Sequence, residues 1–388
     1  MRIRRCTCFL LEPYTYRSLD LAGLLAGSAK LEERSGWRAL AAHIDGPIEV
    51  DAAQVLALGS IPPDSWSDFE ALAQTHSRGV IEALLSARLL MIEGESETLE
   101  ADGIREWNGL NAVAWRHSRW RQVDAERATA WLGRDAADVR DRLGTPPALV
   151  GERGDASLRL SLPRSVSPGP CSGLPDARAT CRNFDPARPI DLSVLSQMME
   201  NVFAARAVSR TSDVAVMKRA VPSAGGLHPI EAYLLIQHVE AMEPGLYHYH
   251  PVEHSLQPLR TLGPEQAREY AAQFVARQDW FADAAVLVVL AARFARNHWK
   301  YRRHTKSFRA MVLDAGHLSQ MQYLAATELG LGAFITAAIN EGDIEDAFGL
   351  DPMQEGVLAV TGFGWRGERM EVLEFDPLRK VWPDWSPE

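Results

Sequence analysis

Two adjacent glycines, Gly225 and Gly226, stand in the stretch Pro222-Ser-Ala-Gly-Gly-Leu-His-Pro229, directly before the apolar run 231–236. Glycine has no Cβ, so the backbone here can take unusual dihedral angles and lie against a ligand while presenting N–H donors to it. A planar cofactor would suit such a surface. The alternative is an ordinary tight turn before a strand, because glycine punctuates loops of many kinds.

Two arginines flank a hydroxyl further upstream, in Arg178-Ala-Thr180-Cys-Arg182. Guanidinium groups match the oxygens of a phosphate, and the threonine hydroxyl adds another donor, so the three side chains could meet one phosphate. The alternative is a solvated surface, where arginines are common.

Histidine and cysteine do not form a ligand pattern for a metal. His248, His250 and His254 lie on an expected hairpin without a partner at ligand spacing, and Cys6 and Cys8 lack a second close-spaced pair. We therefore expect no metal site and no disulfide framework.

The elements that must position these residues are strands and helices in succession. The apolar patterns predict strands at 231–239, 245–249, 256–259, 285–292, 333–337 and 356–361, and helices at 192–203, 264–275, 305–330 and 344–348. This order predicts an α+β domain over residues 176–388.

A smaller unit is expected over residues 1–143. Short helices are expected from Tyr14 onward, with Ser65 or Ser67 as a cap, then a helix at 80–85 and a strand at 89–92. Helix, helix and strand favour a winged-helix-like unit, whose strand edge could bind an extended peptide, while a purely structural role stays open.

The helical region 103–143 is rich in tryptophan, and we expect its tryptophans to pack in a core or an interface. They are Trp107, Trp115, Trp120 and Trp131. The stretch 144–175 is dense in proline and glycine, which predicts a linker between the two units.

Composition excludes several classes of protein. The chain has 388 residues, of which 46% are hydrophobic, and a net charge of −10. Its length suits two domains, and its acidic balance argues against a general binder of nucleic acid or of anionic membranes. No apolar run reaches the ~18 residues of a membrane span and no signal-peptide core is found, so we expect a cytoplasmic protein.

Several motifs occur in an order that is typical of one family. They are Arg178-x-Thr180-x-Arg182-x-Phe184, the stretch Pro222–Pro229, Pro244-Gly-Leu-Tyr-His-Tyr249, Trp299-Lys300-Tyr301, Asp314-Ala-Gly-His-Leu318 and Leu329-Gly-Leu-Gly332. Over about residues 176–370 the chain resembles the nitroreductase superfamily, and within it the SagB-type peptide-maturation dehydrogenases.

The resemblance implies a fold, a cofactor and partners. The fold would be a mixed sheet flanked by helices that binds FMN, with active sites at a homodimer interface. The activity would be oxidation of thiazolines and oxazolines to thiazoles and oxazoles in a modified precursor peptide of ribosomal origin. A cyclodehydratase that makes the azoline is the partner enzyme this activity implies.

The resemblance also assigns roles to residues. Arg178, Thr180, Arg182 and Arg366 would hold the FMN phosphate. Ser223, Gly225 and Gly226 would line the isoalloxazine, with a backbone N–H reaching its hydride-accepting nitrogen.

Lys300 and Tyr301 match the family's catalytic pair. Azoline oxidation needs a proton removed and a hydride passed to flavin, so a positioned base is required. We expect Tyr301 to be the base and Lys300 to orient or tune it, with the reverse assignment open. Outside the motif, the pair would be interpreted as exposed residues at a helix start.

Two other functions remain open. The same scaffold could be a flavin reductase that draws hydride from NAD(P)H to reduce an alkene, a dehydroamino acid or a nitro group. It could also be a peptide-binding scaffold without chemistry, since His228, Met321 and the pair Ala337–Ala338 depart from the family's pattern.

Overall fold

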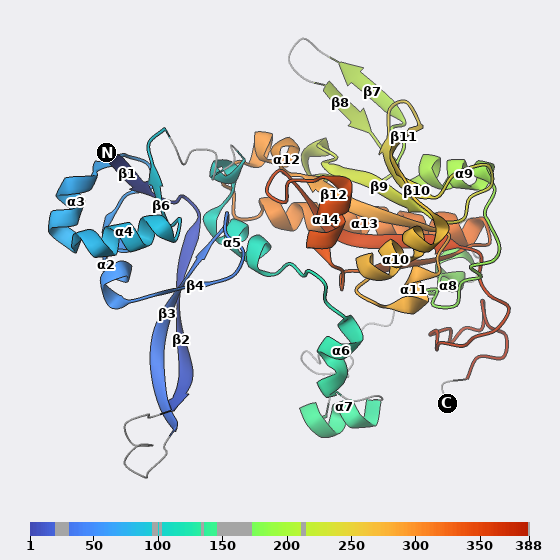
Figure 1. Cartoon of the computed structure of the whole chain (residues 1–388). Coiled ribbons are helices and arrows are strands. Elements are labelled where there is room, and N and C mark those ends of the chain that lie inside the picture. The colour runs from blue at the N-terminus through green and yellow to red at the C-terminus, as the bar shows by residue number, and fades with distance from the viewer. Residues whose placement is uncertain are drawn as a thin grey trace, which may run out of the picture.

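The computed structural model describes residues 1–19, 31–94, 100, 103–132, 136–145, 173–210 and 215–386. Figure 1 shows a small N-terminal unit on one side and a larger sheet-centred unit on the other, with α5 (Gly109–His117) between them. Most of the predicted linker, residues 146–172, lies outside the described residues.

The larger unit is built on a six-stranded sheet of order β11-β10-β9-β12-β14-β13. Its strands are β9 (Ile230–Ile236), β10 (Gly245–His250), β11 (Ser255–Thr261), β12 (Val286–Arg293), β13 (Gly332–Thr336) and β14 (Glu355–Gly364). These strand pairs are antiparallel. The mixed character expected of the sheet is confined to two isolated parallel bridges, Thr180 with Ala333 and Ile190 with Val239.

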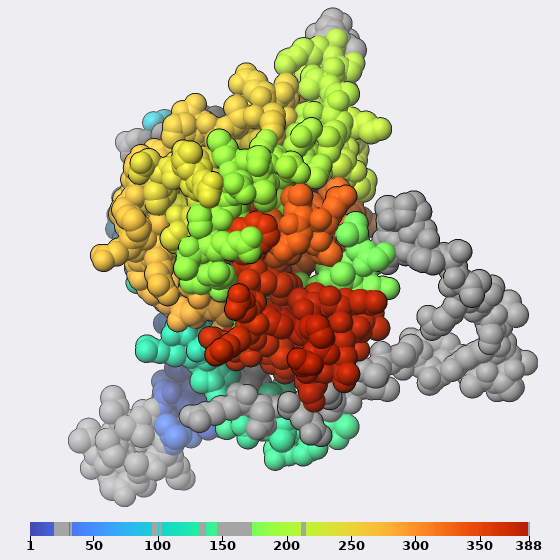
Figure 2. All heavy atoms as spheres, turned by 90° about the vertical axis from the view of Figure 1, so that its right-hand side faces the viewer, coloured from blue at the N-terminus to red at the C-terminus, as the bar shows by residue number. Residues whose placement is uncertain are grey.

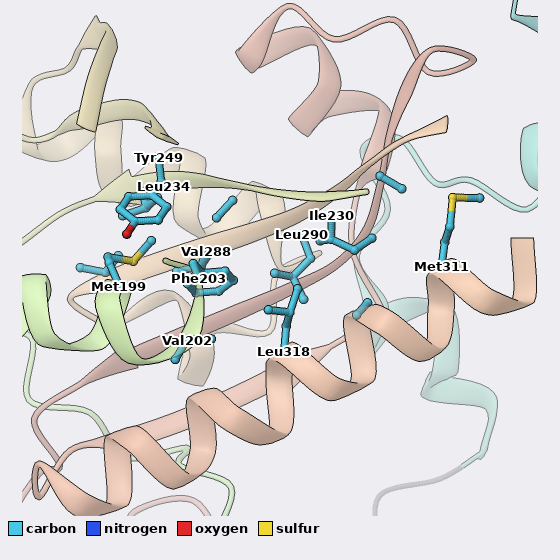
Figure 3. Packing of buried hydrophobic residues seen from close by; sticks show 14 of the residues in the cluster. Met199, Val202, Phe203, Ile230, Leu234, Tyr249, Val288, Leu290, Met311 and Leu318 are labelled. Carbon is cyan, nitrogen blue, oxygen red and sulfur yellow. The ribbon is translucent and has the colours of Figure 1, made fainter. Parts of the chain in front are cut away.

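Helices cover both faces of the sheet, so the fold is α+β as predicted. One face carries α9 (Leu192–Val202) and α13 (Ser307–Glu328), and the other carries α10 (Pro264–Phe274), α11 (Asp279–Ala282) and α14 (Glu341–Phe348). Figure 3 shows Leu234 and Val288 of the sheet facing Met199 of α9 and Leu318 of α13. Because β9 and β12 are buried on both faces, their sequences are nearly continuous apolar runs.

The N-terminal unit joins a small sheet to short helices. The sheet has the order β5-β1-β6, with β1 (Arg2–Arg5), β5 (Ser67–Asp68) and β6 (Leu90–Ile92), and the helices are α2 (Ala52–Ser60), α3 (Phe69–His76) and α4 (Arg78–Ser86). This arrangement is winged-helix-like, as predicted. The cap of α3 is Asp68, whose Oδ1 accepts from the N–H of Ala71 at 3.1 Å, so the assignment to Ser65 or Ser67 was wrong.

The prediction of short helices from Tyr14 onward was also wrong. Residues there form the long hairpin of β2 (Phe9–Leu19) and β3 (Leu31–Ala41), to which β4 (Ile48–Val50) pairs. Tyr14, Thr15 and Tyr16 are good strand formers, but most side chains of the hairpin are exposed or half-buried, so no apolar period marks it.

The tryptophan-rich region between the units contains η2 (Ile104–Glu106), α5, α6 (Ala125–Thr129), η3 (Ala130–Leu132) and α7 (Ala136–Leu143). Trp107 and Trp115 are buried in the same apolar core as α9 and α13, which confirms their packing role. Trp131 is 59% exposed, so for this residue the prediction was wrong.

Three further elements surround the candidate site. They are α8 (Gly173–Ala177), the exposed hairpin of β7 (Ala207–Arg210) and β8 (Ala215–Lys218), and α12 (Phe294–Tyr301). Among the helices that the structure describes, none combines the length and the apolar character that crossing a bilayer requires.

Candidate active site

The glycine pair forms a short turn, η5 (Ala224–Gly226), just before β9. Gly225 has φ +64° and Gly226 has φ +69°, both in the left-handed region that side chains with a Cβ rarely adopt. Two consecutive positive φ angles explain why glycine stands at both positions.

Lys300 and Tyr301 converge on this turn from the last residues of α12. A Cβ added to Gly225 would lie 2.7 Å from the Tyr301 hydroxyl oxygen and 3.0 Å from Lys300 Nζ. Lys300 Nζ also lies 5.6 Å from the centre of the Tyr301 ring. The structure therefore brings together residues far apart in the sequence, and it places the pair at the end of a helix rather than at its start.

Ser223 and Asp314 fasten the turn to α13. The Ser223 hydroxyl donates to Asp314 Oδ2 at 2.5 Å, and the N–H of Ala224 donates to Asp314 Oδ1 at 3.1 Å. The same hydroxyl accepts from the N–H of His228 at 2.9 Å. Burial raises the pKa of Asp314, while the bonds from Ser223 and Ala224 oppose that rise. The sequence analysis assigned no role to Asp314, although this residue is the first of the motif Asp314-Ala-Gly-His-Leu318.

One N–H of the turn is left for a ligand. Gly226 N–H donates to the Ser223 carbonyl at 3.0 Å and Leu227 N–H to the Ala224 carbonyl at 3.4 Å. Within the residues that the structure describes, no acceptor lies in reach of the Gly225 N–H. The same residue, Gly225, is the one whose Cβ position lies close to the Lys300 and Tyr301 side-chain ends.

His228 is buried behind the turn and takes a left-handed conformation, with φ +48°. Burial, with Arg219 and Arg296 nearby, lowers its pKa to about 4. Arg219 is itself buried and donates to the Ile230 carbonyl at 2.8 Å. His228 is therefore neutral at physiological pH, and its neighbourhood is positively charged.

The predicted phosphate residues gather around another part of α13. Thr180 Oγ1 lies 3.0 Å from the Tyr323 hydroxyl oxygen, and the Arg178 guanidinium stands over the Tyr323 ring, 5.4 Å from its centre. Neither Arg178 nor Arg182 has a carboxylate partner for its guanidinium among the described residues. Both are available for an anion.

Arg366 differs from the other two arginines because its guanidinium is paired. It binds Glu374, whose side chain is completely buried, and it donates to the Ala179 carbonyl at 3.0 Å. Glu374 also accepts from the N–H of Arg182 at 2.6 Å. Figure 2 shows the C-terminal segment, in red, lying against the green segment that begins near residue 173. Sequence reasoning missed Glu374, for which no motif gave a signal.

Arg182 also lines an open cavity of about 720 Å³ together with Phe184, Trp280, Asp279 and Asp283. Arg178 and Thr180 thus share Tyr323 as a neighbour, whereas Arg182 joins the group through its backbone N–H, which donates to Glu374.

The two groups of predicted residues occupy opposite flanks of α13. Asp314 marks the glycine turn and Tyr323 marks the phosphate group, and helix geometry separates them by about 14 Å along the axis and by half a turn around it. Within one chain, therefore, the turn and the phosphate group do not face one another.

His248 on β10 does have a carboxylate partner, contrary to the sequence expectation. Its Nε2 lies 3.2 Å from Glu231 Oε2, and Arg293 donates to the other oxygen of Glu231 at 3.2 Å. The contacts of His248 and Arg293 hold the pKa of Glu231 below its usual value in spite of its burial.

Comparison with known proteins gives a family match over the larger unit. Residues 176–365 match the nitroreductase family. The Methanocaldococcus jannaschii protein MJ1384, which its name places among the nitroreductases, is 34% identical over 33% of this chain and 62% of its own length.

Other relatives carry names from peptide processing. The trifolitoxin-processing protein TfxB of Rhizobium leguminosarum bv. trifolii is 30% identical over 37% of this chain and 39% of its own length. The microcin B17-processing protein McbC of Escherichia coli is 24% identical over 47% of this chain and 65% of its own length. A solved E. coli microcin synthetase McbBCD complex with truncated pro-MccB17 bound contains a chain with a TM-score of 0.48 and 18% identity, covering 64% of this chain and 89% of that one. The matches span less than two thirds of each curated relative.

Proposed function

We propose that the nitroreductase family domain formed by residues 176–365 works as an FMN-dependent dehydrogenase on a ribosomally made peptide. The reaction would convert a thiazoline or oxazoline into a thiazole or oxazole. The observation that carries this proposal is the convergence of Lys300 and Tyr301 on Gly225, whose N–H has no hydrogen-bond partner among the described residues. The names of the relatives TfxB and McbC support a peptide substrate.

The residues present fit a flavin mononucleotide. The turn at Gly225 and Gly226 has no Cβ, and a Cβ at Gly226 would find no atom within 4 Å, so a flat ring system can approach the backbone. Arg178 and Arg182 provide guanidinium groups without carboxylate partners among the described residues, and Thr180 adds a hydroxyl. When bound, the flavin would supply the hydride acceptor.

The chain's own residues would remove the proton from the substrate. Oxidation of the azoline ring removes a hydride from one ring carbon and a proton from its neighbour, and a double bond forms between the two. Tyr301 would accept that proton at its phenolic oxygen. Lys300, whose Nζ lies 5.6 Å from the centre of the Tyr301 ring, would orient that phenol. The Gly225 N–H would hold the acceptor in place.

A second copy of the chain would complete each site, because the turn and the phosphate group lie on opposite flanks of α13. The outer face of α13 also has the character of an interface. Val312 is 48% exposed and Leu313 is 59% exposed, and Gly316 next to them leaves room for close approach. We therefore expect light scattering to give the mass of a homodimer.

The substrate defines what must act before this enzyme. An azoline arises when a cysteine, serine or threonine side chain closes on the preceding carbonyl with loss of water. A cyclodehydratase must therefore supply the modified precursor peptide, and the cytoplasm, where the peptide is made, is where both would act. The winged-helix-like unit, over residues 1–143, would hold the peptide.

One observation favours a second function. The relative MJ1384 is named as a nitroreductase, so the chain could instead pass hydride from NAD(P)H through FMN to an alkene, a dehydroamino acid or a nitro group. The two functions differ in the direction of hydride flow. The third possible function is a scaffold that binds peptide and catalyses no reaction.

The test begins with the purified full-length protein and mass identification of any released chromophore. The holoenzyme is then mixed without oxygen with a synthetic peptide that carries one thiazoline. We expect bleaching of the flavin, slowed about 10²-fold or more in Tyr301→Phe with flavin content unchanged. Tyr16→Phe, on the exposed hairpin, is the matched control and should react like the wild type.

Other results would support a different function or a different base. Steady consumption of NAD(P)H, with no bleaching by the thiazoline peptide, would support the reductase. A colourless protein that does not bind added FMN would leave the peptide-binding scaffold. A fully active Tyr301→Phe enzyme would remove Tyr301 as the base.

A further inference from the structure

The loop that follows Tyr301 is held by residues outside the family domain. Arg302 Nη2 lies 2.6 Å from Glu106 Oε1, and the N–H of Arg303 donates to the Glu106 carbonyl at 2.8 Å. Arg303 Nε also donates to the Arg105 carbonyl at 3.0 Å. Glu106 therefore fixes the two residues next to Tyr301 through both its side chain and its backbone.

The loop needs such support because its backbone is strained. Arg303 has φ +55°, a left-handed conformation that costs a residue with a Cβ about 1–2 kcal/mol. A residue persists there only when its surroundings impose the conformation. The bonds from residues 105 and 106 are the contacts that can do this.

Residues 104–117, which we call the bridging segment, also fix α12 itself. The Trp107 ring lies edge-on to Phe294, with centroids 4.5 Å apart, and to His298, with centroids 5.0 Å apart. Further along, Asn111 Nδ2 donates to the Thr305 carbonyl at 3.0 Å. The helix that ends in Lys300 and Tyr301 is thus packed against the bridging segment along its length.

The other side of the bridging segment belongs to the N-terminal unit. His117 Nε2 lies 3.1 Å from the Ala41 carbonyl at the base of the long hairpin, and Cys8 Sγ lies 3.5 Å from the Ile104 carbonyl. Cys8, Ala42 and Trp107 share one apolar core with Phe294 of α12. The core around α12 therefore extends through the bridging segment to Cys8 and Ala42 of the N-terminal unit.

We infer that Glu106 is a positioning residue for Lys300 and Tyr301, and that the N-terminal unit supports the reaction as well as any peptide it holds. The inference rests on the proposed function, because it assigns a task to the pair that would carry the chemistry. Proton transfer demands this support, since a displacement of about 1 Å can cost 10²-fold in rate. Glu106 lies outside residues 176–365, so the family match does not contain it.

The test uses full-length holoenzyme with Glu106→Gln, which keeps the size and the backbone bonds but removes the charge. The pair is partly exposed, with 28% of the Glu106 side chain and 61% of the Arg302 side chain accessible, so its loss should be worth a factor of about two to five. We expect flavin reduction by the thiazoline peptide to slow by that factor, with KM unchanged. Amide exchange of residues 302–306 should rise by a similar factor.

Two further variants give rescue and control. The charge exchange Glu106→Arg with Arg302→Glu should restore both the rate and the protection of the loop. Glu93→Gln breaks a comparable exposed pair, Arg2 with Glu93 at 3.0 Å, elsewhere in the same unit and should change neither quantity. A loop that exchanges faster without a slower reaction would overturn the inference, as would a Glu106→Gln protein with unchanged exchange.

Failure of the proposed function would be recognisable separately. If the wild-type holoenzyme does not react with the thiazoline peptide, the proposed function fails, and amide exchange of residues 302–306 still tests the inference. Loss of the pair between Glu106 and Arg302 should raise that exchange whether or not the peptide reacts. Unchanged exchange in Glu106→Gln would overturn the inference without reference to any substrate.

Discussion

Replacing Gly225 by alanine should separate catalysis from stability more sharply than any other single change. The new Cβ would lie 2.7 Å from the Tyr301 hydroxyl oxygen and 3.0 Å from Lys300 Nζ. Non-bonded atoms prefer about 3.5–4.0 Å, so the hydroxyl must move by about 1 Å. Both groups are the ends of flexible side chains, and they can therefore yield without disturbing the fold.

The two effects differ in size. Alanine at φ +64° costs about 1–2 kcal/mol of backbone strain, which sets the expected loss in free energy of unfolding. A displacement of about 1 Å at the reacting groups costs about 10²-fold in rate. We therefore expect Gly225→Ala to fold with a small loss of stability and to reduce its flavin about a hundred times more slowly.

Gly349→Ala, at the end of α14 and outside the proposed cofactor site, is the matched control. Its φ is +71°, so the strain is the same, but its Cβ would meet no atom within 4 Å. Urea unfolding of the flavin-free proteins should give equal losses of stability for the two variants. Stopped-flow reduction, corrected for the fraction of protein that carries flavin, should slow severely only in Gly225→Ala. Equal rates in the two variants would refute the reasoning, because they would mean that the position of Tyr301 and Lys300 does not limit the reaction.

Two further predictions concern the phosphate group and the acid range. Arg182→Ala should weaken FMN binding about tenfold or more in a fluorescence titration, because a charge-assisted bond to the phosphate is lost. Arg366→Ala should instead lower the free energy of unfolding of the flavin-free protein by about 3 kcal/mol or more, because it leaves Glu374 buried without its partner. The reverse pattern would contradict the assignment of Arg182 to the phosphate and of Arg366 to the fold. Burial lowers the pKa of His298 from 6.5 to about 4, so below pH 6.5 the unfolded chain binds a proton that the folded chain does not. The free energy of unfolding should therefore be highest above pH 6.5 and should fall by up to about 1.4 kcal/mol per pH unit as the pH drops toward 4. Urea unfolding at pH 7.5 and at pH 5 should show a smaller fall in His298→Phe than in the wild type.

The sequence predicted the central strands β9 and β12 of the larger unit well because these two strands are buried on both faces. Apolar runs of that kind, such as 286–293 in β12, leave little ambiguity once turn residues bound them. The hairpins β2–β3 and β7–β8 were not predicted because they are largely exposed, as Val208 and Val216 of the second hairpin illustrate. An exposed strand carries no alternating apolar pattern. Burial thus made β9 and β12 predictable, whereas the exposed strand β11 was predicted from its place after a turn.

The site was predictable as a set of residues but not as an arrangement. The motifs indicated Gly225 and the pair Lys300–Tyr301, yet spacing along the chain could not bring them together, because the contact depends on how α12 packs. Asp314 and Glu374 were missed as partners since acidic residues are mostly exposed, and burial of these two follows only from the fold.

Backbone with positive φ lies on both sides of the proposed reaction centre, as it does at several other places in the chain. Gly225, Gly226 and His228 have positive φ on one side, and Arg303 has positive φ on the other. Such a conformation costs a residue with a Cβ, here His228 or Arg303, about 1–3 kcal/mol, and it persists where the surroundings determine it. Here the surroundings are carboxylates: Asp314 holds the glycine turn through Ser223 and Ala224, and Glu106 holds the loop after Tyr301.

This arrangement accounts for the placement of acids that take no part in the proposed chemistry. A turn free to relax would turn the Gly225 N–H away, and a loop free to relax would let Tyr301 swing from the substrate. Because each carboxylate binds backbone or side-chain donors of a strained segment, the strain is offset in the folded protein before any ligand arrives. The Gly225 N–H and the proposed base, Tyr301, are therefore held in place in advance, as the proposed transfer of a hydride and a proton would require.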